Sequence, residues 1–175
     1  MHLFKTTFAT LAFAGAMFAQ SGGGNPLVAS SQGLFHNVKG TILRSVDEVP
    51  ANLWDFRPTP EVRTFGQLFA HIADGQYEFC GAATGDKPAN PGVEKTAKSK
   101  EEVVAALKKA FDYCDAAYQK ITPAGASEMV NFFGNKMARI TVMDFNIAHT
   151  DEHYGNLVTY MRLKGIVPPT SQPRK

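Results

Sequence analysis

The chain has 175 residues, of which 44% are hydrophobic, 11% aromatic and 19% charged, with a formal net charge of +2. This composition predicts one soluble domain with a hydrophobic core, and its small net charge and many aromatics exclude intrinsic disorder. The sequence has no basic excess and no basic run interleaved with aromatics, which argues against a nucleic-acid partner. No stretch approaches the roughly 20 apolar residues of a transmembrane helix.

The first 19 residues have the pattern of a secretory signal peptide. Lys5 supplies a positive charge, residues 8–18 form an apolar run, and small residues suitable for cleavage follow. A hydrophobic first helix of the domain is the alternative, but the Ser/Gly-rich linker 20–24 favours a removable leader. We therefore expect residues 1–19 to be removed and the protein to be exported to the periplasm or beyond, without stable membrane insertion afterwards.

The first two predicted helices have clear start signals. Asn25 suits an N-cap and Pro26 the first helical position, and apolar residues then recur every three or four positions to near Pro50. The apolar stripe of this helix is Leu27, Ser31, Leu34, Phe35, Val38, Ile42, Val46 and Val49. After a proline-containing loop, Thr64 and Gln67 form a capping box. The second stripe is Phe65, Leu68, Phe69, Ile72, Phe79, Cys80 and Ala83.

Two further helices are predicted in the second half of the chain. A polar connection rich in Pro and Gly spans residues 84–98, and Ser99 with Glu102 forms a second capping box. The third stripe is Val103, Leu107, Ala110, Phe111, Cys114, Tyr118 and Ile121. Residues 124–136 are expected to form a loop, and the last helix to run from 137 to 164. Its main stripe is Met143, Ile147, Tyr154, Val158 and Met161.

Four amphipathic helices without a convincing alternating strand predict an all-α four-helix bundle over residues 25–169, followed by a tail at 170–175. Cys80 and Cys114 lie on the stripes of the second and third helices. A disulfide between them requires these helices to run parallel, which the long connection permits. Two buried free thiols are the alternative, and the spacing alone leaves both open.

Three histidines carry the only chemical signal in the sequence. His149 and His153 are four residues apart, so both imidazoles lie on one face of a helix and can reach one cation. His71 lies beside the apolar stripe of the second helix and can meet this pair where two helices pack. Three neutral imidazoles with a fourth position left to water form the ligand set of a catalytic metal centre. The alternative is three histidines satisfied by ordinary hydrogen bonds.

Other polar residues give weaker indications. His36 lies on the polar side of the first helix, and Asp151 and Glu152 point away from the histidine pair, so all three are expected to face solvent. Asp74, one turn from His71, is either an outer partner of that imidazole or an exposed acid. No general acid or base can be named, and phosphate-loop, HExxH and nucleophile-elbow motifs are absent from the sequence.

Two segments resemble the signatures of DinB-like (DinB/YfiT) proteins. Residues 64–73, TFGQLFAHIA, resemble the signature of the family's second helix. Residues 147–165, IAHTDEHYGNLVTYMRLKG, resemble its HxxxHxGQL…YLR…G ending. Trp54 and Pro58 match the loop that precedes the second helix. The sequence departs at Asn156, where Gln is usual, and at Tyr154, where Arg is common, so dimer or pocket contacts can differ.

The resemblance implies an up-down-down-up bundle, often a homodimer, that holds a divalent metal ion, commonly zinc or nickel. The ligands would be His71, His149 and His153. Parallel second and third helices would also place Cys80 and Cys114 at one level. From these expectations we predict an exported metal-dependent hydrolase or transferase acting on a small molecule. The alternative is a non-catalytic secreted bundle that binds a metal or small ligand as a dimer.

Overall fold

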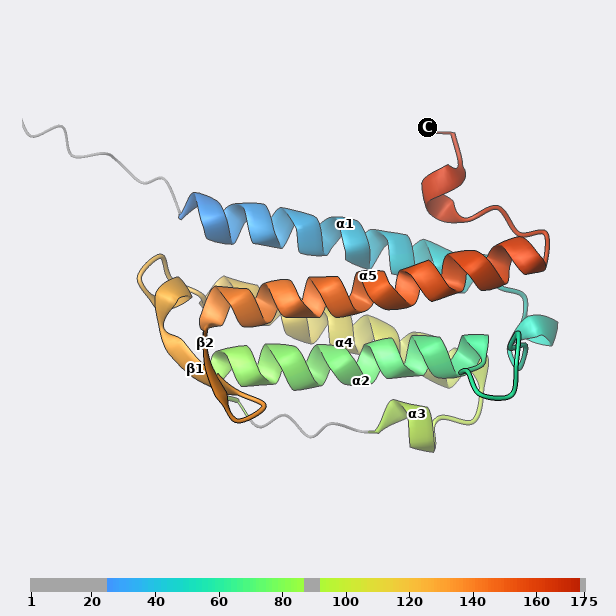
Figure 1. Cartoon of the computed structure of the whole chain (residues 1–175), viewed down its shortest axis with the longest axis horizontal. Coiled ribbons are helices and arrows are strands. Elements are labelled where there is room, and N and C mark those ends of the chain that lie inside the picture. Colours follow the sequence, from blue (N-terminus) through green and yellow to red (C-terminus); the bar gives the residue numbers. More distant parts are fainter. Residues whose placement is uncertain (1–24, 87–91, 174–175) are drawn as a thin grey trace, which may run out of the picture.

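Four long helices pack side by side into a bundle in the computed structural model, which describes residues 25–86 and 92–173 (Figure 1). They are α1 (Pro26–Glu48), α2 (Phe65–Thr84), α4 (Lys100–Lys120) and α5 (Arg139–Leu163). Shorter elements are helix α3 (Val93–Thr96), strands β1 (Met129–Phe132) and β2 (Asn135–Ala138), and 3-10 turns at Ala51–Leu53, Gly125–Ser127 and Pro169–Ser171. The predicted four-helix bundle is confirmed. The predicted signal peptide 1–19 and linker 20–24 lie outside the described residues.

Contacts between helix ends give the direction of each helix. Near the start of α1, the Ser31 hydroxyl donates a 2.6 Å hydrogen bond to Asp144, which lies near the start of α5. Lys100, the first residue of α4, donates through Nζ to the carbonyl oxygen of Val49 just beyond the end of α1. At the other end of α4, Lys120 Nζ donates to Asp86, which lies two residues beyond the end of α2. Helices α1 and α5 therefore run one way and α2 and α4 the other, in the order up, down, down and up (Figure 1).

The expected N-caps of the first three long helices are present, but the second capping box is incomplete, because Glu102 Oε2 accepts from the backbone N–H of Lys98 rather than of Ser99. Asn25 Oδ1 accepts a 2.9 Å hydrogen bond from the backbone N–H of Leu27. At the start of α2, the Thr64 hydroxyl accepts from the backbone N–H of Gln67 at 3.2 Å, and Gln67 Oε1 accepts from the backbone N–H of Thr64 at 2.9 Å. This reciprocal pair satisfies two backbone donors and fixes where α2 begins, and with it the direction of every side chain on that helix.

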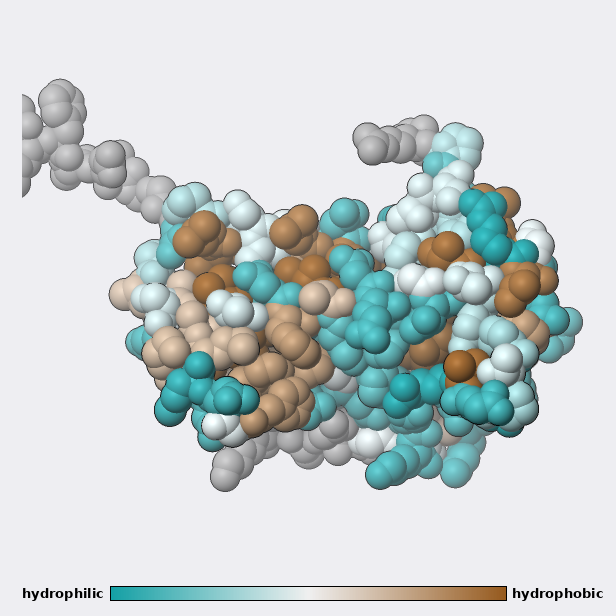
Figure 2. Space-filling model, in the orientation of Figure 1, coloured by the Kyte–Doolittle hydropathy of each residue, from teal (hydrophilic) through white to brown (hydrophobic). Residues whose placement is uncertain are grey.

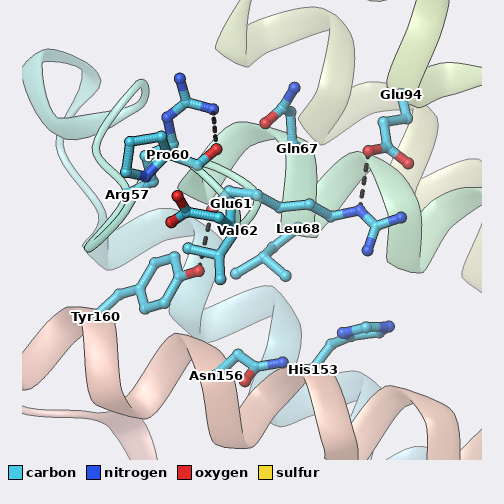
Figure 3. Close-up of a pocket in the computed structure, with 11 residues that line it drawn as sticks. Arg57, Pro60, Glu61, Val62, Gln67, Leu68, Glu94, His153, Asn156 and Tyr160 are labelled. Atoms are coloured by element: carbon cyan, nitrogen blue, oxygen red, sulfur yellow. Dashed lines mark hydrogen bonds and ion pairs between the residues drawn. The ribbon is translucent and has the colours of Figure 1, made fainter.

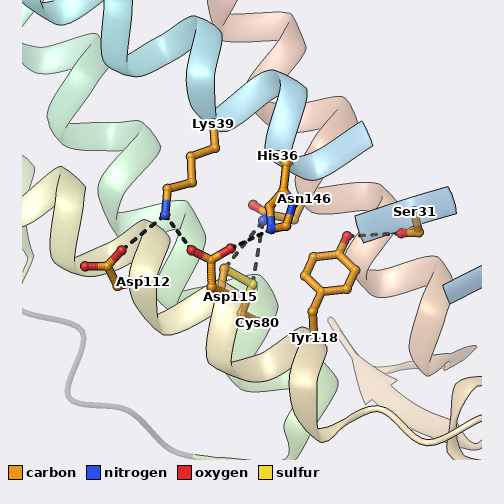
Figure 4. A network of polar contacts seen from close by, with 9 residues as sticks. Ser31, His36, Lys39, Cys80, Asp112, Asp115, Tyr118 and Asn146 are labelled. Atoms are coloured by element: carbon orange, nitrogen blue, oxygen red, sulfur yellow. Dashed lines mark hydrogen bonds and ion pairs between the residues drawn. A yellow bond between two sulfur atoms is a disulfide. The ribbon is translucent and has the colours of Figure 1, made fainter. Parts of the chain in front are cut away.

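Cys80 of α2 and Cys114 of α4 form a disulfide, with Cα atoms 5.4 Å apart (Figure 4). Both cysteines are fully buried, and the alternative of two free thiols is wrong. Each lies in the second half of its helix, so their pairing requires α2 and α4 to run in the same direction. Asn146 of α5 places Nδ2 at 3.6 Å from both sulfur atoms, which brings a third helix into the same contact.

The buried face of α5 differs from the predicted stripe. Asn146 Nδ2 donates to Gln76 Oε1 at 2.8 Å, and Gln76 Nε2 donates to the Thr150 hydroxyl at 3.0 Å. These three polar side chains are buried and partner one another, so they occupy core positions outside the apolar stripes predicted from the sequence. The buried residues of α5 are Val142, Met143, Asn146, Ile147, Thr150, His153, Leu157, Tyr160 and Met161. The face that packs on the bundle is therefore turned toward the histidine pair.

A β-hairpin occupies most of the segment that was expected to be a loop, so that prediction is wrong for residues 129–136. Strands β1 and β2 pair antiparallel, with Phe132 opposite Asn135. The two connecting residues, Phe133 and Gly134, have φ angles of 47° and 80°, as a type I′ turn requires. Phe132 is buried against Phe79 of α2, with ring centroids 5.7 Å apart. This long-range contact stabilises strands too short to show alternation in the sequence.

His36 faces solvent, as predicted, with 54% of its side chain exposed. Its Nε2 atom lies 3.1 Å from Asp115 Oδ1, and Lys39 pairs with both Asp112 and Asp115, so α1 and α4 are joined at the surface (Figure 4). The pairs that involve the exposed side chains of His36 and Asp112 contribute little to stability. None of the helices in the described part of the chain has both the length and the apolar character to cross a bilayer.

Candidate metal centre

The three predicted ligands meet between α2 and α5. His149 Nε2 lies 3.2 Å from His71 Nε2 and 3.1 Å from His153 Nε2. One nitrogen atom of each residue lies within 4.8 Å of the other two. The capping box sets the direction of His71 on α2, and the four-residue spacing stacks the other two on one face of α5. The structure thus brings together the three imidazoles that the sequence singled out.

The spacing of these nitrogen atoms fits a single divalent cation. Nitrogen ligands bind zinc at about 2.0–2.1 Å, so two of them in a tetrahedral arrangement lie about 3.3 Å apart. The two Nε2–Nε2 distances of 3.1 and 3.2 Å are close to that value. Three histidines could therefore hold one ion with little movement, and one coordination position would stay open for water or a substrate.

Glu94 lies against the far nitrogen of His71. Its Oε2 atom is 3.2 Å from His71 Nδ1. Because a carboxylate only accepts hydrogen bonds, this contact favours the tautomer with the proton on Nδ1, which leaves the lone pair on Nε2, the atom nearest His149. His149 Nε2 can then supply at most one proton to its two neighbours. A cation at the centre would satisfy all three lone pairs at once.

Asp74 supports the histidine cluster indirectly, through helix α3. Its two carboxylate oxygens accept the backbone N–H groups of Val93 and Glu94, at 2.7 and 3.0 Å. Asp74 therefore anchors helix α3, and α3 presents Glu94 to His71. Sequence reasoning missed Glu94, which lies in the polar connection predicted at 84–98. Nothing in its local pattern distinguishes it from other charged residues of that segment. Asp151 and Glu152 are exposed, as predicted.

The surroundings of His149 keep its imidazole neutral. Burial, then the neighbouring His153 and His71, lower the pKa of His149 to about 3. Burial also lowers the pKa of His153. The Nδ1 atoms of both residues are buried and have no hydrogen-bond partner in the described structure. Phe79 packs edge-on against His149 at a centroid distance of 4.8 Å. A neutral imidazole retains the lone pair that metal binding needs.

Comparison with known proteins identifies the family. A family model described as the DinB superfamily matches residues 34–157, which is more than half of the chain. The chain belongs to the DinB superfamily. The matched segment includes all three histidines and lies within the domain predicted at 25–169.

Solved structures of DinB-like proteins share the fold of this DinB protein. A DinB-like protein from Bacillus cereus ATCC 10987 is 17% identical with a TM-score of 0.71, covering 81% of this chain and 95% of that one. One from Bacillus subtilis is 17% identical with a TM-score of 0.67, covering 86% and 100%. A mycothiol-dependent maleylpyruvate isomerase is 14% identical with a TM-score of 0.63, covering 74% and 60%. No curated protein matches the chain.

A pocket of about 500 Å³ opens beside the histidines of this DinB protein (Figure 3). His153 forms part of its wall, so the pocket and the three-histidine cluster share one residue. Figure 3 shows His153 and Asn156 on one side of the hollow and Gln67 on the other. The rest of the wall is formed by Arg57, Pro60, Glu61, Val62, Arg63, Leu68, Glu94 and Tyr160. A molecule in this pocket would therefore lie next to the histidine cluster.

Gly75 leaves room for the ring of His149. A Cβ atom at this position would lie 2.8 Å from His149 Cε1 and 3.1 Å from His149 Nδ1. We expect Gly75→Ala to displace the imidazole and to weaken zinc binding at least about tenfold, as loss of an outer partner does. The measurement is competition with a chromophoric chelator. Gly33→Ala is the control, because nothing lies within 4 Å of that Cβ position on α1.

If Gly33→Ala weakens zinc binding as strongly as Gly75→Ala, the clash with His149 is not the cause. We expect Gly33→Ala instead to raise the free energy of unfolding by about 0.5–1 kcal/mol, since alanine favours the helix over glycine.

Glu94→Gln is expected to lower zinc affinity about 10–100-fold, because the amide no longer holds the His71 tautomer with a full charge. Glu128→Gln is a matched control, since Glu128 also pairs with an arginine, Arg139, at 2.6 Å but contacts none of the three histidines. The same chelator competition measures both variants. Equal affinities for the two would show that Glu94 has no effect on the centre.

Proposed function

We propose that this DinB protein binds a divalent metal ion, zinc or nickel, through His71, His149 and His153. The convergence of three Nε2 atoms at the spacing of metal ligands is the observation that supports the proposal. Imidazole suits both metals. The lowered pKa values of His149 and His153 and the contact of Glu94 with His71 Nδ1 add support, because a neutral imidazole can offer its Nε2 lone pair to a metal ion.

We further propose that the protein is a metal-dependent hydrolase or transferase acting on a small molecule. A bound metal ion supplies Lewis acidity and lowers the pKa of a coordinated water or thiol. The residues of the chain then have separate tasks. Glu94 orients His71, Phe79 and Gly75 confine His149, and the adjoining pocket gives a substrate a place beside the open coordination position.

The pocket also favours an enzyme over a non-catalytic binding module. A protein that only sequesters a metal ion gains from closing the coordination sphere with a fourth side chain, as structural zinc sites do. Here three histidines converge with no fourth His, Cys, Asp or Glu grouped with them in the described residues. Turnover of small-molecule substrates that depends on added zinc or nickel would support the enzyme, whereas ligand binding without turnover would support the module.

Elemental analysis tests the metal proposal directly. The protein is purified without a histidine tag, reconstituted separately with zinc and nickel, and passed through gel filtration to remove loose ions. We expect close to one metal ion per chain for at least one of the two metals. Less than a tenth of an ion per chain with both metals would contradict the proposal.

Export is proposed from the predicted leader together with the disulfide. Disulfides form and persist in oxidising compartments and are rare in the cytoplasm. The Cys80–Cys114 bond joins two buried positions in the centre of the fold, which is typical of a structural disulfide. N-terminal sequencing of the protein from a periplasmic or culture fraction would support the proposal if the chain begins at or near residue 20.

We also propose a homodimer through an apolar groove between α1 and α5. Leu27 and Leu34 lie on the predicted core stripe of α1 but are 68% and 58% exposed. They line the groove together with Ile140 and Ile147 of α5. Figure 2 shows apolar surface over this part of the bundle. A second copy of the chain would bury these leucines, which explains their periodic placement.

Sedimentation equilibrium tests this assembly. We expect a dimer for the parent protein and a monomer for Leu34→Glu, because burying a carboxylate in an apolar interface is costly. Leu163→Glu should remain dimeric, since Leu163 is 60% exposed but does not line the groove. A monomeric parent, or a dimeric Leu34→Glu variant, would contradict the assignment.

A further inference from the structure

The pocket beside His153 contains four charged residues, and three of them are already engaged. Glu94 uses one carboxylate oxygen on Arg63 Nε and the other on His71 Nδ1. Arg57 Nη1 donates to the carbonyl oxygen of Pro60 at 3.0 Å. The carboxylate of Glu61 accepts a hydrogen bond from the side chain of Thr59, which holds the pKa of Glu61 below its usual value.

Arg63 is held through its backbone carbonyl and its Nε atom, while the edge of the guanidinium formed by Nη1 and Nη2 has no partner in the described residues. Tyr160 Oη donates to the carbonyl oxygen of Arg63 at 3.0 Å, and Arg63 Nε donates to Glu94 Oε1 at 2.9 Å. Within the described residues, neither Nη1 nor Nη2 of Arg63 makes a hydrogen bond. The positive charge of Arg63 also helps to lower the pKa of both His149 and His153, so it lies close to the histidine cluster.

The neutral polar side chains of the wall add further donors. Gln67 Oε1 is used by the capping box, which leaves its Nε2 group free to donate. The side-chain amide of Asn156 has no hydrogen-bond partner in the described structure, and it faces Gln67 across the hollow (Figure 3). The groups available to a ligand are therefore a guanidinium edge and two amides, a set that suits an oxyanion.

We propose that this pocket binds the carboxylate of a small acidic molecule, with Arg63 as the specificity-determining residue. A planar carboxylate matches the two parallel N–H groups of a guanidinium edge. The inference rests on the proposed function, because the second functional group of the same molecule would then reach the metal centre. The substrate class is accordingly a small carboxylic acid that carries a second polar or thiol group.

Binding of matched thiols to the cobalt-substituted protein tests the inference. Cobalt(II) gives an absorption band when a thiolate binds it, so affinity is read without any enzymatic assay. The probes are mercaptoacetate against 2-mercaptoethanol, and 3-mercaptopropionate against 3-mercaptopropanol, at fixed pH and ionic strength. In at least one pair, we expect the carboxylate to bind about tenfold tighter than the alcohol, the gain typical of a charge-assisted contact.

Three variants show whether Arg63 causes the preference. Arg63→Gln should reduce the carboxylate-over-alcohol preference to less than about twofold. Arg63→Lys should retain part of it, because the charge remains but the fork is lost. Arg44→Gln removes the same charge from a residue of α1 outside the pocket and should leave the preference intact.

The outcomes separate the two proposals. A chain that binds no cobalt, zinc or nickel contradicts the proposed function itself. A chain that binds cobalt but shows equal affinities within both pairs overturns the carboxylate pocket and leaves the metal centre standing. If Arg63→Gln keeps the full preference, or if Arg44→Gln loses it equally, the assignment to Arg63 is wrong. If Arg63→Gln no longer holds cobalt, equal affinities within both pairs in Arg63→Lys would overturn the assignment, and a retained preference would support it.

Discussion

His149→Ala is expected to lose zinc binding by at least about 1,000-fold, because loss of an outer partner alone costs about 10–100-fold and His149 is a proposed ligand. His149 is also the central imidazole, in contact with both His71 and His153 through Nε2. Its removal leaves two nitrogen donors on different helices. Metal content after gel filtration, with affinity from chelator competition, measures the effect.

His36→Ala is the matched control for this experiment. It removes the same side chain from an exposed position on α1, where the imidazole contacts Asp115 and none of the other histidines. We expect parental metal content in this variant and a similar free energy of unfolding. Parental zinc affinity in His149→Ala would mean that the three-histidine cluster is not the binding site.

Replacing both cysteines by alanine is expected to lower the free energy of unfolding by about 3–4 kcal/mol, because the unfolded chain regains the entropy of a closed loop. The cross-linked positions are 34 residues apart in the sequence. Urea unfolding of the Cys80→Ala/Cys114→Ala variant and of the parent gives the difference. A loss of this size would be a large part of the stability of a single domain.

Reduction of the parent protein distinguishes the contribution of the disulfide bond to stability from that of the packing of the two sulfur atoms. Parent protein unfolded and refolded in excess reductant lacks the bond, so its stability should fall toward that of the double variant. A difference below about 1 kcal/mol between oxidised parent and double variant would contradict a stabilising role for the disulfide.

The meeting of the histidines could be predicted because it depends on short-range rules. The spacing of His149 and His153 places them on one helix face, and the Thr64–Gln67 box sets the start of the helix that carries His71. The packing of the His71 helix against this face was expected from the resemblance to DinB-like proteins, since the apolar stripe predicted for α5 is not the face that packs on the bundle. The same reasoning could not choose between a disulfide and free thiols, because that depends on the relative direction of two helices.

Glu94 and the β-hairpin could not be predicted because both depend on contacts distant in the sequence. Glu94 reaches His71 only after Asp74 has anchored α3 by its backbone. The hairpin strands are four residues each, and Phe133 occupies a turn position with positive φ that normally favours Asn or Gly. The buried face of α5 could not be predicted from apolar periodicity either, because it includes the polar residues Asn146, Thr150 and His153.

The position of the metal ion is the most direct test of the account. Crystals of zinc-loaded protein should give one strong anomalous difference peak at the zinc edge, at about 2.0–2.1 Å from the Nε2 atoms of His71, His149 and His153. The fourth position should hold water or a small ligand on the side of the pocket. Zinc bound elsewhere on the chain, with the three imidazoles free of it, would contradict the proposed centre and the function built on it.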